Sequence, residues 1–347
     1  MKNMKRNCCL LLLPCLLCSC SFFDNTKLQL SEHQLVLEPG QSHALEIQWN
    51  KNNALVFRIS NREIIDIDIS NHLITAKKEG RSTLIVTQKR ANRDTCDVVV
   101  RYNHIEPTEP LNVATIAHKG YHVDAIENTA KAFSEAGRRN FFGIETDIHR
   151  TLDGRWICNH DNKVKGMSKN ISECTFEEIM AVNLSNNPNE TIRVCTFENY
   201  LDICYAYNKH PVIEIKESTS KERLEEIITD LVRYDILNDV IFISKLGDVL
   251  GSLLNIKNER GFNFDLQMLT EGNGWQYVSE FLNVSSQYEA ITPDMAKSIR
   301  LTGQYVAAWT VNDRDVANSL IDMGVKYITT DIFECDFQYL DHDLFGI

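Results

Sequence analysis

The stretch FFGIETDIHRTLDGRWICNHD, residues 141–161, decides how the second half of the chain is interpreted. Each of its two apolar runs leads into polar residues: Glu145 and Asp147 follow the first run, and His160 follows the second. Because side chains alternate along a strand, Glu145 and Asp147 are expected on one face. Reacting groups at the carboxyl ends of strands are typical of a β/α barrel.

The same alternation of strand and helix continues to about residue 330. Nine strands are expected, at Val113–His118, Phe142–Ile148, Trp156–Asn159, Val212–Lys216, Val240–Ser244, Phe264–Met268, Tyr288–Ile291, Tyr305–Thr310 and Tyr327–Thr330. Repeated strand–helix units of this number favour an α/β fold, a (β/α)8 TIM barrel over residues 112–347, rather than an open doubly wound sheet. A barrel has eight places, so we expect Tyr288–Ile291, one of the four-residue candidates, to lie outside it.

Three acids at expected strand ends predict a metal site. Glu145, Asp147 and Glu214 would meet in the mouth of the barrel. Carboxylates that converge in a partly desolvated pocket repel one another unless a cation is present. Ligation by oxygen alone suits one hard divalent cation, Mg²⁺ or Ca²⁺, rather than zinc.

Two histidines and two lysines complete this predicted site. His118 and His160 each end an apolar run beside a charged residue, and two imidazoles can divide general base and general acid work near neutral pH. Lys119 and Lys216 add positive charge where an anionic group would bind. A metal, two cations and an acid–base pair fit phosphodiester cleavage.

The part of the chain before the barrel has a different pattern. Short β-branched runs separated by turn signals predict an all-β sandwich over residues 26–103. Three segments resemble bacterial Ig-like domains of group 2: LEPGQS (37–42), ISNREIIDID (59–68) and LITAKKEGRSTLIV (73–86). Residues 104–111, with Pro107 and Pro110, are expected to be a linker.

The first twenty residues predict a bacterial lipoprotein signal peptide. A basic start and a short apolar run lead into LCSC (17–20), which resembles a lipobox with Cys20 as the lipidated residue. A plain signal peptide cut elsewhere is the alternative. The formal net charge of −12 argues against nucleic acid as a partner and against electrostatic binding to an anionic membrane surface. Membrane attachment would therefore come from the lipid on Cys20. We expect a cell-envelope lipoprotein, periplasm-facing or surface-exposed.

Five blocks resemble the signature blocks of glycerophosphodiester phosphodiesterases, in the same order and at compatible spacing. They are TIAHKGYHVDAIENTAKAF (115–133), FFGIETDIHRTLDGRWICNHD (141–161), PVIEIK (211–216), VAAWTVND (306–313) and GVKYITTDIF (324–333). The resemblance covers nearly the whole second domain. It implies a TIM barrel like that of phosphatidylinositol-specific phospholipase C, in which His118 and His160 are the acid–base pair.

The resemblance also implies a metal site and a substrate site. The expected metal ligands are again Glu145, Asp147 and Glu214. The positions expected to bind the phosphate or the glycerol are Lys119, Glu127, Asn128, Lys216 and Trp309.

This chain departs from the family pattern at two of these positions or beside them. Lys119 stands where the family usually has arginine, and an ammonium cannot reproduce a bidentate guanidinium contact to phosphate. Ile126 replaces the usual proline before Glu127. We expect altered substrate affinity or preference, but an active enzyme.

The expected function is therefore metal-dependent hydrolysis of a small glycerophosphodiester to sn-glycerol 3-phosphate and an alcohol. Attack by water and attack by the substrate's own hydroxyl through a cyclic phosphate both stay open. One alternative is a non-catalytic surface lipoprotein that binds polyol phosphates or acts as an adhesion module. A barrel glycosidase fits poorly, because it needs neither the histidines nor a metal.

Overall fold

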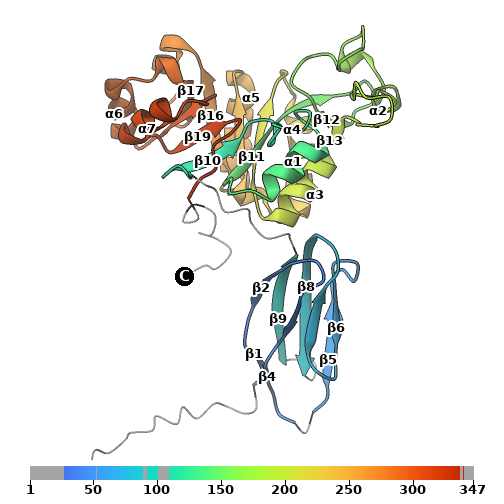
Figure 1. Cartoon of the computed structure of the whole chain (residues 1–347). Helices are drawn as coiled ribbons and strands as arrows, with labels where there is room; N and C mark the ends of the chain where they lie inside the picture. The colour runs from blue at the N-terminus through green and yellow to red at the C-terminus, as the bar shows by residue number, and fades with distance from the viewer. Residues whose placement is uncertain (1–26, 52, 89–91, 101–108, 337–338, 340–347) are drawn as a thin grey trace, which may run out of the picture.

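The computed structural model describes residues 27–51, 53–88, 92–100, 109–336 and 339 (Figure 1). The expected signal peptide with Cys20 lies outside the described residues, as does most of the expected linker. None of the helices in the described part of the chain is both long and apolar enough to cross a membrane.

The described residues up to Val100 form β-sheets, in agreement with the alternating apolar pattern. One sheet has the order β2-β9-β8-β5, a second has the order β3-β7-β6, and β1 pairs with β4. The strands are β1 (Gln29–Leu30), β2 (Gln34–Leu37), β3 (Ser42–Ala44), β4 (Ile47–Gln48), β5 (Leu55–Ile59), β6 (Ile65–Asp68), β7 (Leu73–Ala76), β8 (Gly80–Gln88) and β9 (Asn92–Val100). Alternate side chains such as Leu84, Val86 and Val98 fill the core, as in an Ig-like sandwich.

Eight parallel strands close into a barrel in the second region, which confirms the predicted fold. Their order is β10-β19-β18-β17-β16-β15-β14-β11, and pairing of β10 with β11 closes the ring. The strands are β10 (Ala114–Ala117), β11 (Gly143–Arg150), β14 (His210–Ile215), β15 (Ile241–Ser244), β16 (Asp265–Thr270), β17 (Asn283–Gln287), β18 (Val306–Trp309) and β19 (Tyr327–Thr330).

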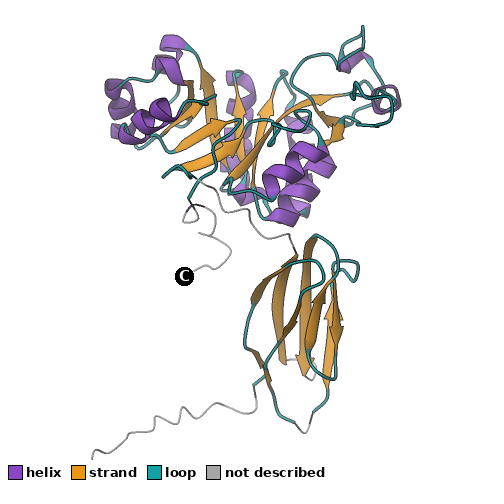
Figure 2. Ribbon diagram, viewed as in Figure 1, coloured by secondary structure: helices purple, strands orange, loops and turns teal. Residues whose placement is uncertain are grey.

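Helices cover the outside of the barrel (Figure 2). They are α1 (Ala130–Gly137), α3 (Phe197–Tyr207), α4 (Lys221–Arg233), α5 (Gly247–Arg260), α6 (Pro293–Leu301) and α7 (Arg314–Asp322). The short helix α2 (Phe176–Met180) instead packs in a separate apolar cluster with Ile157 and Val194. Apolar side chains on the inner faces of α1, α3, α4 and α5 pack against the strands in one continuous core. Within the ring, side chains such as Ile116, Val212 and Ile241 form a second cluster.

The strand prediction was wrong at two places in the barrel, although Tyr288–Ile291 does lie outside it as expected. The segment at Trp156–Asn159 forms β12 (Trp156–Cys158), which pairs antiparallel with β11 and with β13 (Cys195–Thr196) outside the ring. The eighth place belongs to β17, directly before the candidate Tyr288–Ile291. β17 was missed because its sequence, NVSSQ, is mostly polar, although its central residues are buried.

Candidate active site

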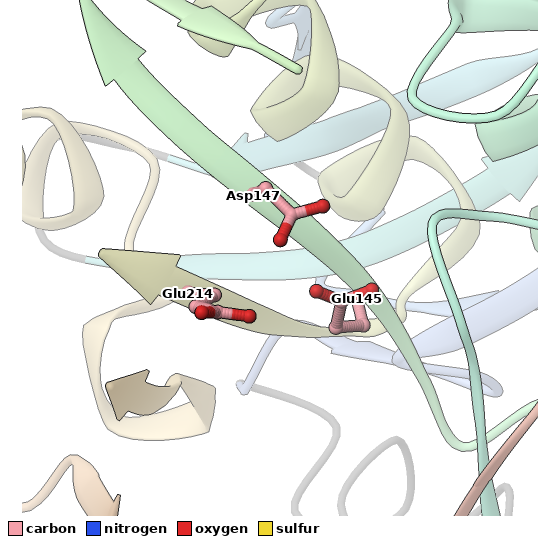
Figure 3. Close-up of side chains that lie close together, drawn as sticks. All are labelled: Glu145, Asp147 and Glu214. Carbon is pink, nitrogen blue, oxygen red and sulfur yellow. The ribbon is translucent and has the colours of Figure 1, made fainter. Parts of the chain in front are cut away.

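The three acidic residues predicted to bind a metal lie together on two neighbouring strands, β11 and β14 (Figure 3). Asp147 on β11 stands directly beside Glu214 on β14 in the parallel pairing, and Glu145 lies two residues earlier on the same face. One carboxylate oxygen from each residue lies within 4.8 Å of the others. Glu145 and Asp147 are only 3% and 1% exposed.

The pKa shifts of these acids show an excess of negative charge. Burial and the charges of Asp147 and Glu214 raise the pKa of Glu145 well above its usual value. Burial and the charge of Asp147 likewise raise the pKa of Glu214. Burial opposes ionisation of Asp147 too, but the Lys216 ammonium and the Asn128 amide outweigh it and lower the pKa. Oxygen ligands with unbalanced charge fit a hard divalent cation.

Lys216 already lies between two of the acids. Its ammonium Nζ is 3.2 Å from Asp147 Oδ1 and 3.1 Å from Glu214 Oε1. Burial alone would lower the pKa of Lys216, but the two carboxylates reverse the effect and raise it. The lysine is therefore protonated near neutral pH and lies where an anionic substrate would meet the acids.

His118 follows β10 directly and is held by a residue that the sequence prediction missed. Its Nδ1 lies 2.8 Å from Asp331 Oδ1, and Asn312 donates a hydrogen bond to the other oxygen of Asp331. Because a carboxylate accepts, Nδ1 carries the proton, and Nε2 is left free to accept one. Asp331 follows β19, so a search for polar residues at strand ends could have found it.

His160 comes from the segment after β12, not from the end of a barrel strand as the sequence suggested. Its Nδ1 lies 2.9 Å from Asp161 Oδ1. The backbone carbonyl of His160 lies 3.4 Å from Nε2 of His149, whose Nδ1 is 2.8 Å from Glu217. His149 is buried on β11, so it ties the His160 segment to the barrel wall.

The structure places Glu127 and Asn128 outside the lining of the pocket. Glu127 forms an ion pair of 3.2 Å with Lys119. Asn128 donates a hydrogen bond of 3.0 Å from Nδ2 to Asp147, and its Oδ1 accepts one from Thr146. The two residues thus orient Lys119 and Asp147. The backbone N–H of Lys119 donates to Glu145 over 2.7 Å.

One pocket of about 210 Å³ brings the other predicted site residues together. Its lining consists of His118, Lys119, Glu145, Asp147, His160, Glu214, Lys216, Ile243, Lys245, Leu269, Ser285, Trp309, Thr310 and Thr329. Trp309 is fixed by a hydrogen bond of 3.1 Å from Nε1 to the carbonyl oxygen of Ser285. Two imidazoles, a carboxylate cluster and lysines in one pocket are groups that can bind and cleave a phosphodiester.

Comparison with known proteins gives a consistent result. Residues 118–334 match the glycerophosphoryl diester phosphodiesterase family. Glycerophosphodiester phosphodiesterase 1 of Mus musculus is 25% identical over 263 residues, which cover 64% of this chain and 79% of the mouse protein. A putative glycerophosphodiester phosphodiesterase of Bacillus subtilis, YhdW, is 25% identical over 232 residues, which cover 62% of this chain and 93% of YhdW.

Solved structures agree with the barrel. A glycerophosphodiester phosphodiesterase from Parabacteroides distasonis has a TM-score of 0.55 and 26% identity, over 64% of this chain and 94% of that one. A phosphodiesterase from Oleispira antarctica, solved with the product sn-glycerol-3-phosphate, has a TM-score of 0.57 and 19% identity, over 63% of this chain and 92% of that one. The similarity to the Oleispira antarctica structure shows a shared fold alone.

Proposed function

Because the chain belongs to the glycerophosphoryl diester phosphodiesterase family, we propose that it hydrolyses glycerophosphodiesters to sn-glycerol 3-phosphate and an alcohol, with one divalent cation and two histidines. The observation that supports this proposal best is the pocket itself. It combines the acids Glu145, Asp147 and Glu214 with His118 and His160. Carboxylates without imidazoles would suit only binding of a cation, whereas the two together suit catalysis.

The cation would be Mg²⁺ or Ca²⁺, held by Glu145, Asp147 and Glu214. When bound, it would supply positive charge for a phosphate oxygen. Lys216 offers a second positive charge from the side of Asp147 and Glu214. Asn128 keeps Asp147 in place through its amide, so that the acids need not rearrange when substrate binds.

The two imidazoles would divide the proton transfers. One histidine takes a proton from the attacking hydroxyl, and the other gives a proton to the departing alcohol oxygen. Asp331 and Asp161 each accept from Nδ1 of their histidine, so both rings direct Nε2 away from these carboxylates. The attacking group is water, or a glycerol hydroxyl that first forms a cyclic phosphate.

We also propose that the mature protein is a cell-envelope lipoprotein anchored through a lipid on Cys20. The LCSC motif at residues 17–20 supports this. Radiolabelled fatty acid supplied to expressing bacteria should enter the wild-type protein but not a Cys20→Ala variant. Equal labelling of both would exclude this anchor.

Turnover of glycerophosphocholine by residues 21–347, with and without chelator, tests the activity. We expect Mg²⁺- or Ca²⁺-dependent release of sn-glycerol 3-phosphate, and loss of activity by about 10²-fold or more in His118→Ala and Glu145→Ala. His33→Ala, at an exposed residue of the sandwich region, is the matched control. Turnover that survives chelation or either active-site substitution would exclude the mechanism, and binding without turnover of any glycerophosphodiester would favour a binding protein.

A further inference from the structure

The pocket has two halves with different chemistry. The acids, His118, His160 and Lys216 come from β10, β11, β14 and the segments that follow them. The opposite half is formed by β15 to β19 and includes Ile243, Leu269 and Trp309 in its lining.

 Among the described residues that line this opposite half of the pocket, Lys245 is the one that carries a charge. Leu269 belongs to the apolar wall of the same half.

Lys245 differs from the other two lysines of the pocket in its partner. Lys216 lies between Asp147 and Glu214, and Lys119 pairs with Glu127. Lys245 pairs with Glu271 at 2.5 Å, but Glu271 does not belong to the pocket lining.

This ion pair lies in solvent at the rim of the pocket. The Lys245 and Glu271 side chains are 54% and 59% exposed. Solvated pairs of this kind contribute little to stability, and an ammonium has three N–H donors. Lys245 can therefore donate a hydrogen bond to a ligand in the pocket, either while its ion pair with Glu271 persists or after that ion pair has broken.

The position of Lys245 also disfavours a cationic ligand beside Trp309. An indole face next to a carboxylate would suit a quaternary ammonium group. Here, however, Nζ of Lys245 lies 5.6 Å from the centre of the Trp309 ring and pairs with the nearby carboxylate of Glu271. A choline group at this place would meet a like charge, whereas an anion would meet an opposite one.

We propose that Lys245 is a specificity-determining residue, which selects glycerophosphodiesters with a second anionic group on the arm that lies against Trp309. The second group is a phosphate or a carboxylate, and the reacting phosphodiester lies at the acids and histidines. This inference rests on the proposed function, because it concerns the same pocket.

The test compares two substrates that differ in one group: glycerophosphoglycerol, and glycerophosphoglycerol phosphorylated on one terminal hydroxyl. Wild type, Lys245→Met and Lys297→Met are assayed with both. Methionine keeps the unbranched apolar stem, and Lys297 is an exposed lysine on α6, away from the pocket lining. We expect wild type to prefer the phosphorylated substrate and the ratio of the two kcat/KM values to fall about tenfold in Lys245→Met alone.

A binding experiment separates this inference from the proposed function. Calorimetry with glycerol 1,3-bisphosphate and with sn-glycerol 3-phosphate gives a ratio of Kd values that needs no turnover. Tighter binding of the bisphosphate by wild type, lost in Lys245→Met, supports the inference even if no diester is cleaved. An unchanged ratio in Lys245→Met, or no preference in wild type, would overturn it while leaving the hydrolysis of simple diesters intact.

Discussion

Asp331 uses both carboxylate oxygens to hold a histidine of the active site. One oxygen accepts from His118 and the other from Asn312. Burial alone would raise the pKa of Asp331, but these two hydrogen bonds and the nearby imidazoles lower it. The carboxylate is therefore ionised at neutral pH and selects the ring tautomer with a proton on Nδ1.

Replacing Asp331 with asparagine should impair catalysis more than substrate binding. In Asp331→Asn the amide can donate to Nδ1, which favours the wrong tautomer of His118. We expect kcat to fall by about 10- to 100-fold with little change in KM. Steady-state kinetics on glycerophosphocholine measure both constants. Asp294→Asn, at an exposed residue of α6, is the control, and an unchanged kcat in Asp331→Asn would show that Asp331 does not position His118.

Glu145 connects metal binding to stability through its raised pKa. The pKa of Glu145 is higher in the folded protein than in the unfolded chain. At a pH between these two values, folded Glu145 keeps a proton that the unfolded chain has released. Without metal, the stability contributed by this group is therefore lost as pH rises from about 4.3, the ordinary value for glutamate. A bound cation would oppose the shift, because it favours the ionised form of Glu145 and balances the charges of Asp147 and Glu214.

The variant Glu145→Gln should raise the stability of the metal-free protein at pH 7. The reason is that an amide carries no charge to be buried near Asp147 and Glu214. We expect the Tm in chelator to rise by about 2–4 °C for each kcal/mol of repulsion removed, and the gain on adding Mg²⁺ or Ca²⁺ to shrink. Calorimetry with and without metal provides the measurement, with the exposed Glu177→Gln as control. A lower Tm in chelator would contradict the prediction.

At the scale of elements, the turn between β10 and α1 determines where His118 and Lys119 lie. Lys119 and Gly120 both have a positive φ, 55° and 77°. A Cβ on Gly120 would lie 2.7 Å from the carbonyl carbon of Ala132 in α1. The close approach of turn and helix therefore requires glycine at this position.

Gly120→Ala should destabilise the protein strongly and lower activity, because the turn must move away from α1. Gly303→Ala is a matched control, since Gly303 has a φ of 82° but no neighbour within 4 Å of the added Cβ. We expect a loss of about 1 kcal/mol for Gly303→Ala from backbone strain. The loss for Gly120→Ala should be greater by about 1–3 kcal/mol because of the clash. Urea unfolding measures both, and equal losses would show that α1 moves aside at no cost.

Comparison of particular elements shows how far the sequence could predict this fold and site. Strands with apolar runs, such as β14 and β15, were predicted because burial on both sides leaves a clear pattern. β17 was not predicted, since small polar residues such as Ser285 and Ser286 are buried only by neighbours distant in sequence. Whether the side chain of a loop residue points into the pocket depends on how distant parts of the chain pack together. The structure was therefore needed to place Glu127 and Asn128.

For the whole molecule, the sandwich region contacts the barrel on the side away from the pocket. Arg138, just after α1, pairs with Glu79 at 2.9 Å, and the guanidinium of Arg81 lies 5.3 Å from the Tyr205 ring of α3. The carboxyl ends of the barrel helices lie near the amino ends of the strands, whereas the pocket lies at the carboxyl ends. The contact therefore leaves the mouth of the barrel open (Figure 1).

Breaking this contact should uncouple the two regions without reducing catalysis. Arg138→Ala leaves Glu79 without its guanidinium partner. We expect a loss of about 1 kcal/mol in stability and a broader or two-step thermal transition, with kcat unchanged. Arg62→Ala, which removes an exposed ion pair with Asp66 within the sandwich, is the control. A single sharp transition at the wild-type temperature would show that the two regions do not stabilise each other here.

Closure of the barrel has a consequence for how the protein becomes active during synthesis. His118 leaves the ribosome early, but Asp331 follows it 213 positions later, directly after β19, the strand that pairs with β10 to close the ring. Contacts of such long sequence separation form late and slowly. The imidazole of His118 therefore acquires its tautomer only once almost all of the chain has been translated. Nascent chains that stop before β19 should carry the three acids, both histidines and the pocket lysines and still be inactive.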